Sequence, residues 1–114
     1  MQRFKSGGTM VQTDAIDSND STNTASTLAT LGFTVTKSAS ATGQQDQDAD
    51  VIWLYIEGNA VRYGAGTPTT SKGLVLQDGE YLLLESTREI ETIKFISAVA
   101  GLHATIHAQI GYSR

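Results

Sequence analysis

The sequence predicts an all-β fold, a β-sandwich or jelly-roll-like barrel of about seven short strands that follows an extended polar N-terminal arm. Three observations support this prediction. Short runs rich in β-branched and aromatic residues recur along residues 32–112. Turn dipeptides separate several of these runs, at Gly58-Asn59, Asp78-Gly79 and Ala100-Gly101. A helix signal occurs over a single short segment, which disfavours helical bundles and alternating α/β folds.

The chain of 114 residues fits one domain, in which we expect two parts. We expect residues 1–31 to form a flexible or extended arm and residues 32–114 to form the β-sandwich. Ser, Thr, Asn, Asp and Ala dominate residues 9–30, and this composition buries too little apolar surface to offset the entropy of ordering. The arm is therefore either a disordered tail or a segment that orders on a neighbouring subunit. In the second case its contacts would come from its scattered apolar residues, which are Val11, Ile16, Leu28 and Leu31.

Composition excludes several classes of function. The formal net charge is -4 and the basic residues are scattered singly, which argues against binding to nucleic acid. The chain has no cysteine, so it has neither a disulfide framework nor a thiolate zinc site. It lacks the apolar run of about 18 residues that spans a membrane, and no apolar h-region follows its basic start. We therefore expect a soluble protein that is not exported by the Sec route.

The first predicted strand is residues 32–37, whose alternation points Phe33 and Val35 inward. Residues 51–57 are the most apolar run, with apolar side chains on both faces. This pattern suits a central strand that is covered on both sides, or a strand at a subunit interface. A second run, residues 60–63, follows the Gly58-Asn59 turn, and the two runs together predict a β-hairpin.

Residues 64–73 contain the only proline and predict a surface loop. Short strands are predicted at 74–76 and 81–85. Ser86 followed three residues later by Glu89 fits a capping box, which predicts a single helical turn carrying Ile90. Another strand is predicted at 93–99.

The last predicted strand, residues 103–112, alternates regularly. Small and apolar residues occupy one face and His103, Thr105, His107 and Gln109 the other, so one face is core and the other is in contact with water. His103 and His107 are about 13 Å apart on such a strand, too far to chelate one ion. One His from each subunit around a symmetry axis remains an alternative metal or anion site.

No motif predicts catalysis. The chain has no nucleophile elbow, no phosphate-binding loop and no metal-ligand cluster, so we expect no enzyme, no catalytic residue, no metal and no cofactor. The acidic loop 44–50 could present carboxylates to calcium, but it lacks the Gly and distal Glu of an EF-hand. The glutamates near Arg88 fit a solvated turn better than a glycosidase cleft. The aromatic residues are either core and interface residues or a stacking platform for sugars or bases; they include Trp53, Tyr55, Tyr63, Tyr81 and Tyr112.

Several motifs resemble those of small virion proteins of tailed bacteriophages. These are the Arg62-Tyr63 strand, the loop Gly66-Thr67-Pro68-Thr69, the turn Asp78-Gly79-Glu80 and the closing run from Gly101 to Ile106. The resemblance covers residues 51–112 and is carried mostly by turn chemistry. It implies a β-sandwich virion component that is made in the host cytoplasm, either a head decoration (cement) protein or a small connector. Its implied partner is the major capsid protein or another virion protein.

We therefore expect a capsid decoration protein that stabilises a head shell, with a head–tail, tail or baseplate connector as the alternative. A glycan-binding β-sandwich module is the alternative from another class. A small core favours a homo-oligomer, and a trimer would suit three-fold positions of a shell. The candidate interface residues are Val11, Ile16, Leu28, Leu31, Trp53, Tyr55, Tyr63, His103 and His107.

Overall fold

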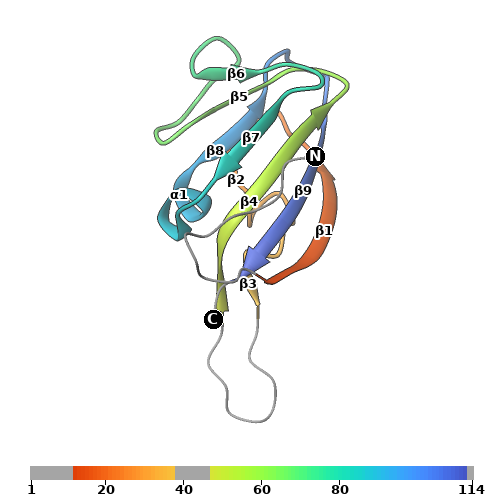
Figure 1. Cartoon of the computed structure of the whole chain (residues 1–114). Coiled ribbons are helices and arrows are strands. Elements are labelled where there is room, and N and C mark those ends of the chain that lie inside the picture. The colour runs from red at the N-terminus through yellow and green to blue at the C-terminus, as the bar shows by residue number, and fades with distance from the viewer. Residues whose placement is uncertain (1–11, 38–46, 113–114) are drawn as a thin grey trace.

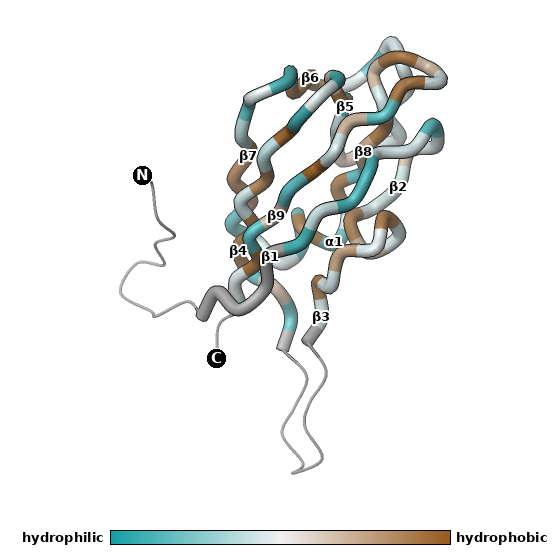
Figure 2. Tube along the Cα trace, turned by 90° about the vertical axis from the view of Figure 1, so that its right-hand side faces the viewer, coloured by the Kyte–Doolittle hydropathy of each residue, from teal (hydrophilic) through white to brown (hydrophobic). Residues whose placement is uncertain are grey.

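The computed structural model describes residues 12–37 and 47–112, and in it two antiparallel β-sheets pack against each other (Figure 1). The predicted all-β sandwich is confirmed. In the first sheet β1 (Gln12–Asp20), β9 (Thr105–Tyr112) and β4 (Gln47–Glu57) are neighbours, and β4 also pairs with β3 (Thr36–Lys37) and β7 (Tyr81–Leu84). The second sheet has the order β2 (Ser26–Thr27), β8 (Lys94–Ser97), β5 (Val61–Gly64) and β6 (Leu74–Leu76). Figure 2 shows the two layers from the side.

The predicted hairpin around Gly58-Asn59 is wrong. Strand β4 belongs to the first sheet and β5 to the second, so the turn carries the chain from one layer to the other. The reason is that β4 has β9 along one edge and β7 along the other, which leaves no edge where β5 could pair. The Asp78-Gly79 turn also crosses between the sheets, from β6 to β7.

These two crossing turns are tied to each other. The Gly58 N–H donates to the Asp78 carboxylate at 2.9 Å, and the Gly79 N–H donates to the Ile56 carbonyl at 2.7 Å. Both glycines have positive φ, 101° and 87°, which side chains other than glycine rarely adopt. The turn residues found in the sequence therefore close the end of the sandwich.

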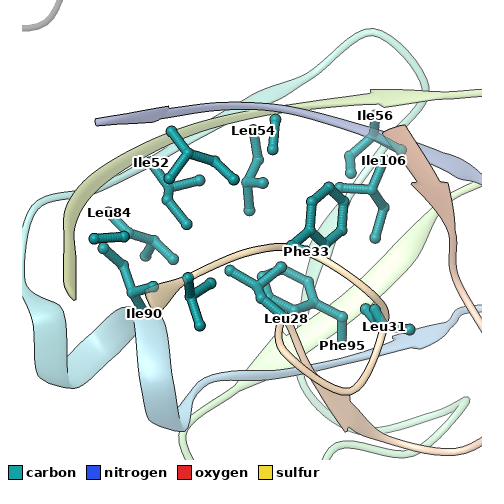
Figure 3. Packing of buried hydrophobic residues seen from close by; sticks show 14 of the residues in the cluster. Leu28, Leu31, Phe33, Ile52, Leu54, Ile56, Leu84, Ile90, Phe95 and Ile106 are labelled. Atoms are coloured by element: carbon teal, nitrogen blue, oxygen red, sulfur yellow. The ribbon is translucent and has the colours of Figure 1, made fainter. Parts of the chain in front are cut away.

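The core lies between the sheets and is lined by one face of β4. Ile52, Leu54 and Ile56 are fully buried there, and Figure 3 shows them opposite Phe95 of β8. Each such side chain contributes about 1.5–3 kcal/mol relative to an exposed one. The small helix α1 (Thr87–Thr92) adds Ile90, which is also fully buried. As predicted, Ser86 is the N-cap of this helix, and its side chain accepts a hydrogen bond from the Glu89 N–H.

The predicted division at residue 31 is corrected by the packing. Within the described residues, 12–20 form β1 in the first sheet, and Ser26–Thr27 form β2 in the second. Leu28 and Leu31 lie in the same core cluster as the strands, with exposures of 0% and 9% (Figure 3). Sequence reasoning misplaced this segment because β1 is polar at every position except Ala15 and Ile16, and because the two leucines come from a tight turn. Leu28 and Leu31 therefore serve the chain's own core and offer almost no surface to a partner.

The first predicted strand is shorter than expected. Only Thr36–Lys37 pair with β4, but Phe33 and Val35 are buried as predicted. Within residues 12–37 and 47–112, no helix has the length and hydrophobicity that crossing a bilayer requires.

Ser21 anchors the end of β1 in the core. Its N–H donates to the Ala104 carbonyl at 2.8 Å, and its hydroxyl oxygen accepts the Ala104 N–H at 2.9 Å. The same hydroxyl is 2.7 Å from the Ser97 hydroxyl on β8. Both serines are buried, at 1% and 0% exposure, so each needs this partner. The pair joins the segment after β1 to both sheets.

We expect Ser21→Ala to lower the free energy of unfolding by about 1–3 kcal/mol, because it leaves the Ala104 N–H and the Ser97 hydroxyl buried without a partner. Ser97→Ala removes the same number of atoms but keeps the Ser21–Ala104 bonds, so its cost should be smaller. Urea unfolding followed by the fluorescence of Trp53 would measure both. A larger loss in Ser97→Ala would contradict the anchoring role of Ser21.

Candidate functional site

The outward-facing side of the first sheet carries a group of aromatic side chains that are half-buried or exposed. Cross-strand pairing sets its rows: Trp53 opposes Leu83 and Gln109, and Tyr55 opposes Tyr81 and His107. We call this surface the outer face. It consists of Ser18, Asp20, Trp53, Tyr55, Glu57, Tyr81, Leu83, Thr105, His107 and Gln109.

The aromatic rings of the outer face contact one another. Trp53 meets Tyr81 edge to face, with ring centroids 5.7 Å apart at 83°. Tyr81 also contacts Tyr55 at 5.0 Å, and Tyr55 contacts the His107 ring at 5.8 Å. These contacts lock the rings in place, so a partner that binds them loses little side-chain entropy.

The outer face is apolar at one side and polar at the other. Tyr81 and Leu83 on β7 are 60% and 40% exposed, whereas their neighbours Leu82 and Leu84 point to the core side. Carboxylates at Asp20 and Glu57 lie on the β1 side and at the end of β4, and no Lys or Arg belongs to the outer face. A partner surface that is apolar with basic residues at its edge would complement it.

His107 joins three strands through its two ring nitrogens. Its Nε2 is 2.7 Å from the Glu57 carboxylate on β4, and its Nδ1 is 2.7 Å from the Ser18 hydroxyl on β1. A neutral ring with its proton on Nε2 donates to Glu57 and accepts the hydroxyl proton of Ser18. Thr105 on the same strand donates to Asp20 at 3.1 Å, which adds a second side-chain bond between β9 and β1.

Ser18, His107 and Glu57 have the residue types of an acyl-transfer triad, namely a hydroxyl, an imidazole and a carboxylate. Such a site also needs N–H donors for the oxyanion. The Ser18 N–H donates to the Asp17 carboxylate at 2.8 Å instead. The His107 and Glu57 side chains are 37% and 61% exposed, on a sheet face rather than in a cleft. The arrangement can fasten β1, β9 and β4 together, and we assign it no reaction.

Of the other predicted site residues in the described part of the chain, only Ile16 has a register position on the outer face. His103 precedes β9, and its carbonyl accepts a hydrogen bond from Asn59, so the pair with His107 on one strand is not formed. Tyr63 stacks on Phe95 in the second sheet, with centroids 5.9 Å apart. Val11 lies outside the described residues. Ile16 opposes Gln109 in the β1–β9 register, and its side chain also lies outside the described part.

Sequence reasoning included Trp53, Tyr55 and His107 among the candidate interface residues and missed Ser18, Glu57 and Leu83. Residues 81–84 are all apolar, so the signal for Leu83 lies in the two-residue period of a strand, which puts Leu83 on the same face as Tyr81. Ser18 and Glu57 gave no such signal. Their contact with His107 depends on β1 and β4 lying on either side of β9, which only the topology decides.

No candidate metal centre forms among residues 12–37 and 47–112, where no group of three or more His, Asp or Glu side chains could hold an ion. Residues 44–46 of the predicted acidic loop lie outside the described residues, and residues 47–50 belong to strand β4 rather than to a loop, because they pair with β3 and β9. The glutamates around α1 at positions 85, 89 and 91 are exposed. No protein-family model, curated protein or solved structure matches the chain.

We expect Tyr81→Ala to shift the emission of Trp53 to longer wavelength, because the substitution uncovers an edge of the indole ring. Unfolding free energy should fall by no more than about 1 kcal/mol, the size of one cross-strand pair. Trp53 is the only tryptophan, so the spectrum reports this site alone. Leu74→Ala on the second sheet is the matched control, since Leu74 is 63% exposed and should leave the emission unchanged. An unshifted spectrum in Tyr81→Ala would contradict the ring contact.

Proposed function

We propose that the chain is a non-enzymatic structural protein of a tailed-bacteriophage virion, a decoration or cement protein that stabilises the head shell. In this proposal the outer face binds the major capsid protein, and the chain acts in the virion after synthesis in the host cytoplasm. The observation that carries it is the mutually packed aromatic cluster of the exposed Tyr81 with the half-buried Trp53 and Tyr55, which has the exposed Leu83 beside it.

The composition of the outer face is that of a protein interface. Tyr and Trp are enriched in the buried centres of interfaces, and polar side chains form the rim. Here the rings hold one another in place. Polar side chains border them on the side of β9 and β1, namely Asp20, Glu57, His107 and Gln109. A cement protein needs such a face and needs no catalytic group. Its many copies on a symmetric shell add avidity to a modest contact.

The motifs that resemble phage virion proteins have structural roles in this chain, which supports a shared sandwich architecture. The Arg62 guanidinium donates from Nε to the Thr70 carbonyl at 2.9 Å and from Nη1 to the Gly73 carbonyl at 3.0 Å. These bonds fold the Gly-Thr-Pro-Thr loop back beside β5. Pro68 is buried, and a side chain at Gly73, where φ is 124°, would meet the Pro68 Cβ at 3.0 Å.

The alternative within the same class is a connector at the head–tail junction, the tail or the baseplate, where the outer face would bind another virion protein. A homo-oligomer, with a trimer as the favoured state, fits either role. Binding to a shell gains strength when several copies act together.

A glycan-binding module is the candidate from another class, and the outer face supports it through a specific feature. Exposed aromatic rings next to side chains that donate and accept hydrogen bonds, here His107, Gln109 and Glu57, can stack on sugar rings and bond their hydroxyls.

We expect the protein to sediment with phage heads that lack their decoration protein, and the double variant Tyr81→Ser, Leu83→Ser to bind them at least about tenfold more weakly. The reason is that both side chains belong to the apolar part of the proposed contact and contribute little to the chain's own core. Sedimentation at a series of protein concentrations measures the affinity.

The matched control is Leu74→Ser, Val75→Ser on β6. Those side chains are 63% and 37% exposed, close to the 60% and 40% of Tyr81 and Leu83, but they belong to the second sheet. The control should bind like the unchanged protein. Equal loss of binding in both double variants would contradict docking through the outer face, and no binding of the unchanged protein would contradict the cement function itself.

We expect titration of Trp53 fluorescence with a panel of bacterial and host glycans to produce no saturable change, because the rings serve a protein contact. Trp53 lies within the cluster that a sugar would have to cover, so binding there would alter its emission. A saturable change that disappears in Tyr81→Ala would favour the glycan-binding module over the cement protein.

A further inference from the structure

Strand β1 lies at an edge of the first sheet and contributes unusually polar residues to the inward side. In the β1–β9 register, Asp17 opposes the buried residue Ala108 and Asn19 opposes the buried residue Ile106. At equivalent positions on the other side of β9, β4 contributes Leu54 and Ile56, which are fully buried. In this part of β1, the strand is therefore held by its backbone ladder and by surface side chains more than by apolar burial.

Asn19 fits its inward position poorly. Its Nδ2 is buried and has no hydrogen-bond partner among the described residues. The side chain lies against Gly32, where an added Cβ would be 3.2 Å from the Asn19 Oδ1. A buried amide without a partner disfavours the closed position of β1, because the same group is hydrated when the strand leaves.

Ser21 marks where the firmly held part of the chain begins. Its bonds to Ala104 and Ser97 fix the residue after β1 in the core, and Leu28 and Leu31 are buried beyond it. The side-chain bonds of β1 itself, from Ser18 to His107 and from Asp20 to Thr105, are at the surface. Residues 17–20 contribute no apolar side chain to the core, so β1 can separate from β9 at the Asp20–Ser21 junction.

We propose that β1 exchanges between copies of this chain, so that β1 of one copy pairs with β9 of another. The edge of β9 that β1 leaves has unpaired N–H and C=O groups, which recruit a new strand. A second copy supplies the strand that this edge already accommodates over eight residue pairs, with the same bonds from Ser18 and Asp20. The exchange can be reciprocal in a dimer or cyclic in a larger ring.

The exchange uses the edge of the sheet, so it stands independently of what the outer face binds. Closed and exchanged forms make the same β1–β9 contacts, and protein concentration then decides between them. Crowding of many copies on one surface would favour the exchanged form.

Cysteine pairing tests the exchange, because the natural chain has no cysteine. Thr105 of β9 opposes Asp20 of β1 on one side and Glu57 of β4 on the other. One mixture contains the single variants Asp20→Cys and Thr105→Cys, and the matched mixture contains Glu57→Cys and Thr105→Cys. Each mixture is incubated at high concentration and then oxidised, and disulfide-linked heterodimers are quantified by mass spectrometry.

We expect at least about tenfold more heterodimer from the Asp20 mixture, since detaching β4 would require opening the core whereas detaching β1 would not. The double variants Asp20→Cys, Thr105→Cys and Glu57→Cys, Thr105→Cys check that each pair can bond within one chain. Similar heterodimer yields from the two mixtures would overturn the exchange.

Asn19→Leu, added to both members of the Asp20 mixture, tests whether the unpartnered amide of Asn19 promotes the exchange. An apolar side chain of similar shape at the inward position should hold β1 in place and slow the formation of heterodimer several-fold, because the strand must leave β9 before it can exchange. The unfolding stability should rise as well. An unchanged rate of heterodimer formation in a folded variant would overturn the role of Asn19. Loss of capsid binding in the earlier experiment would leave this result unaffected, so the two proposals fail separately.

Discussion

Strand β4 has no free edge, and much of the architecture follows from that constraint. With β9 on one side and β7 on the other, the chain that leaves β4 at Gly58 must cross to the second sheet. The crossing brings Val61 of β5 over the buried face of β4, and the return at Gly79 delivers β7 to its edge. The hydrogen bonds between these two turns close one end of the core. A hairpin in place of the crossing would leave Ile52, Leu54 and Ile56 without a covering layer.

In the proposed function, the two faces of the first sheet divide stability from recognition. The inward side chains of β4 and β9 are buried against the second sheet, so changes there would act mainly through folding. The outward side chains add little core burial, and they gather aromatic rings and carboxylates into one surface. His107 belongs to both tasks, because its ring contacts Tyr55 while its nitrogens tie Ser18 and Glu57 together. A partner that covers the outer face would therefore also cover the side-chain bonds that hold β1.

Binding at the outer face would affect the attachment of β1 through the bonds of His107, although neither proposal depends on the other. Desolvation of the Ser18–His107–Glu57 bonds under a partner would strengthen them, since the surrounding dielectric falls. A strand that exchanges between free copies could thus become fixed once the outer face is occupied. A protein that is added to a preformed surface benefits when its strand β1 is loosely attached before assembly and firmly attached after it.

The sequence by itself determined the local structure: the strand alternation of β4 and β9, the capped turn of α1, and the glycine turns at residues 58 and 79. These features depend on neighbouring residues, through side-chain period and backbone conformation. Only the tertiary structure decided which sheet each strand joins, why Leu28 and Leu31 belong to the core, and that Ser18 meets His107 across 89 positions of sequence. Those outcomes depend on which edges are already paired, and a local pattern carries no information about a distant edge.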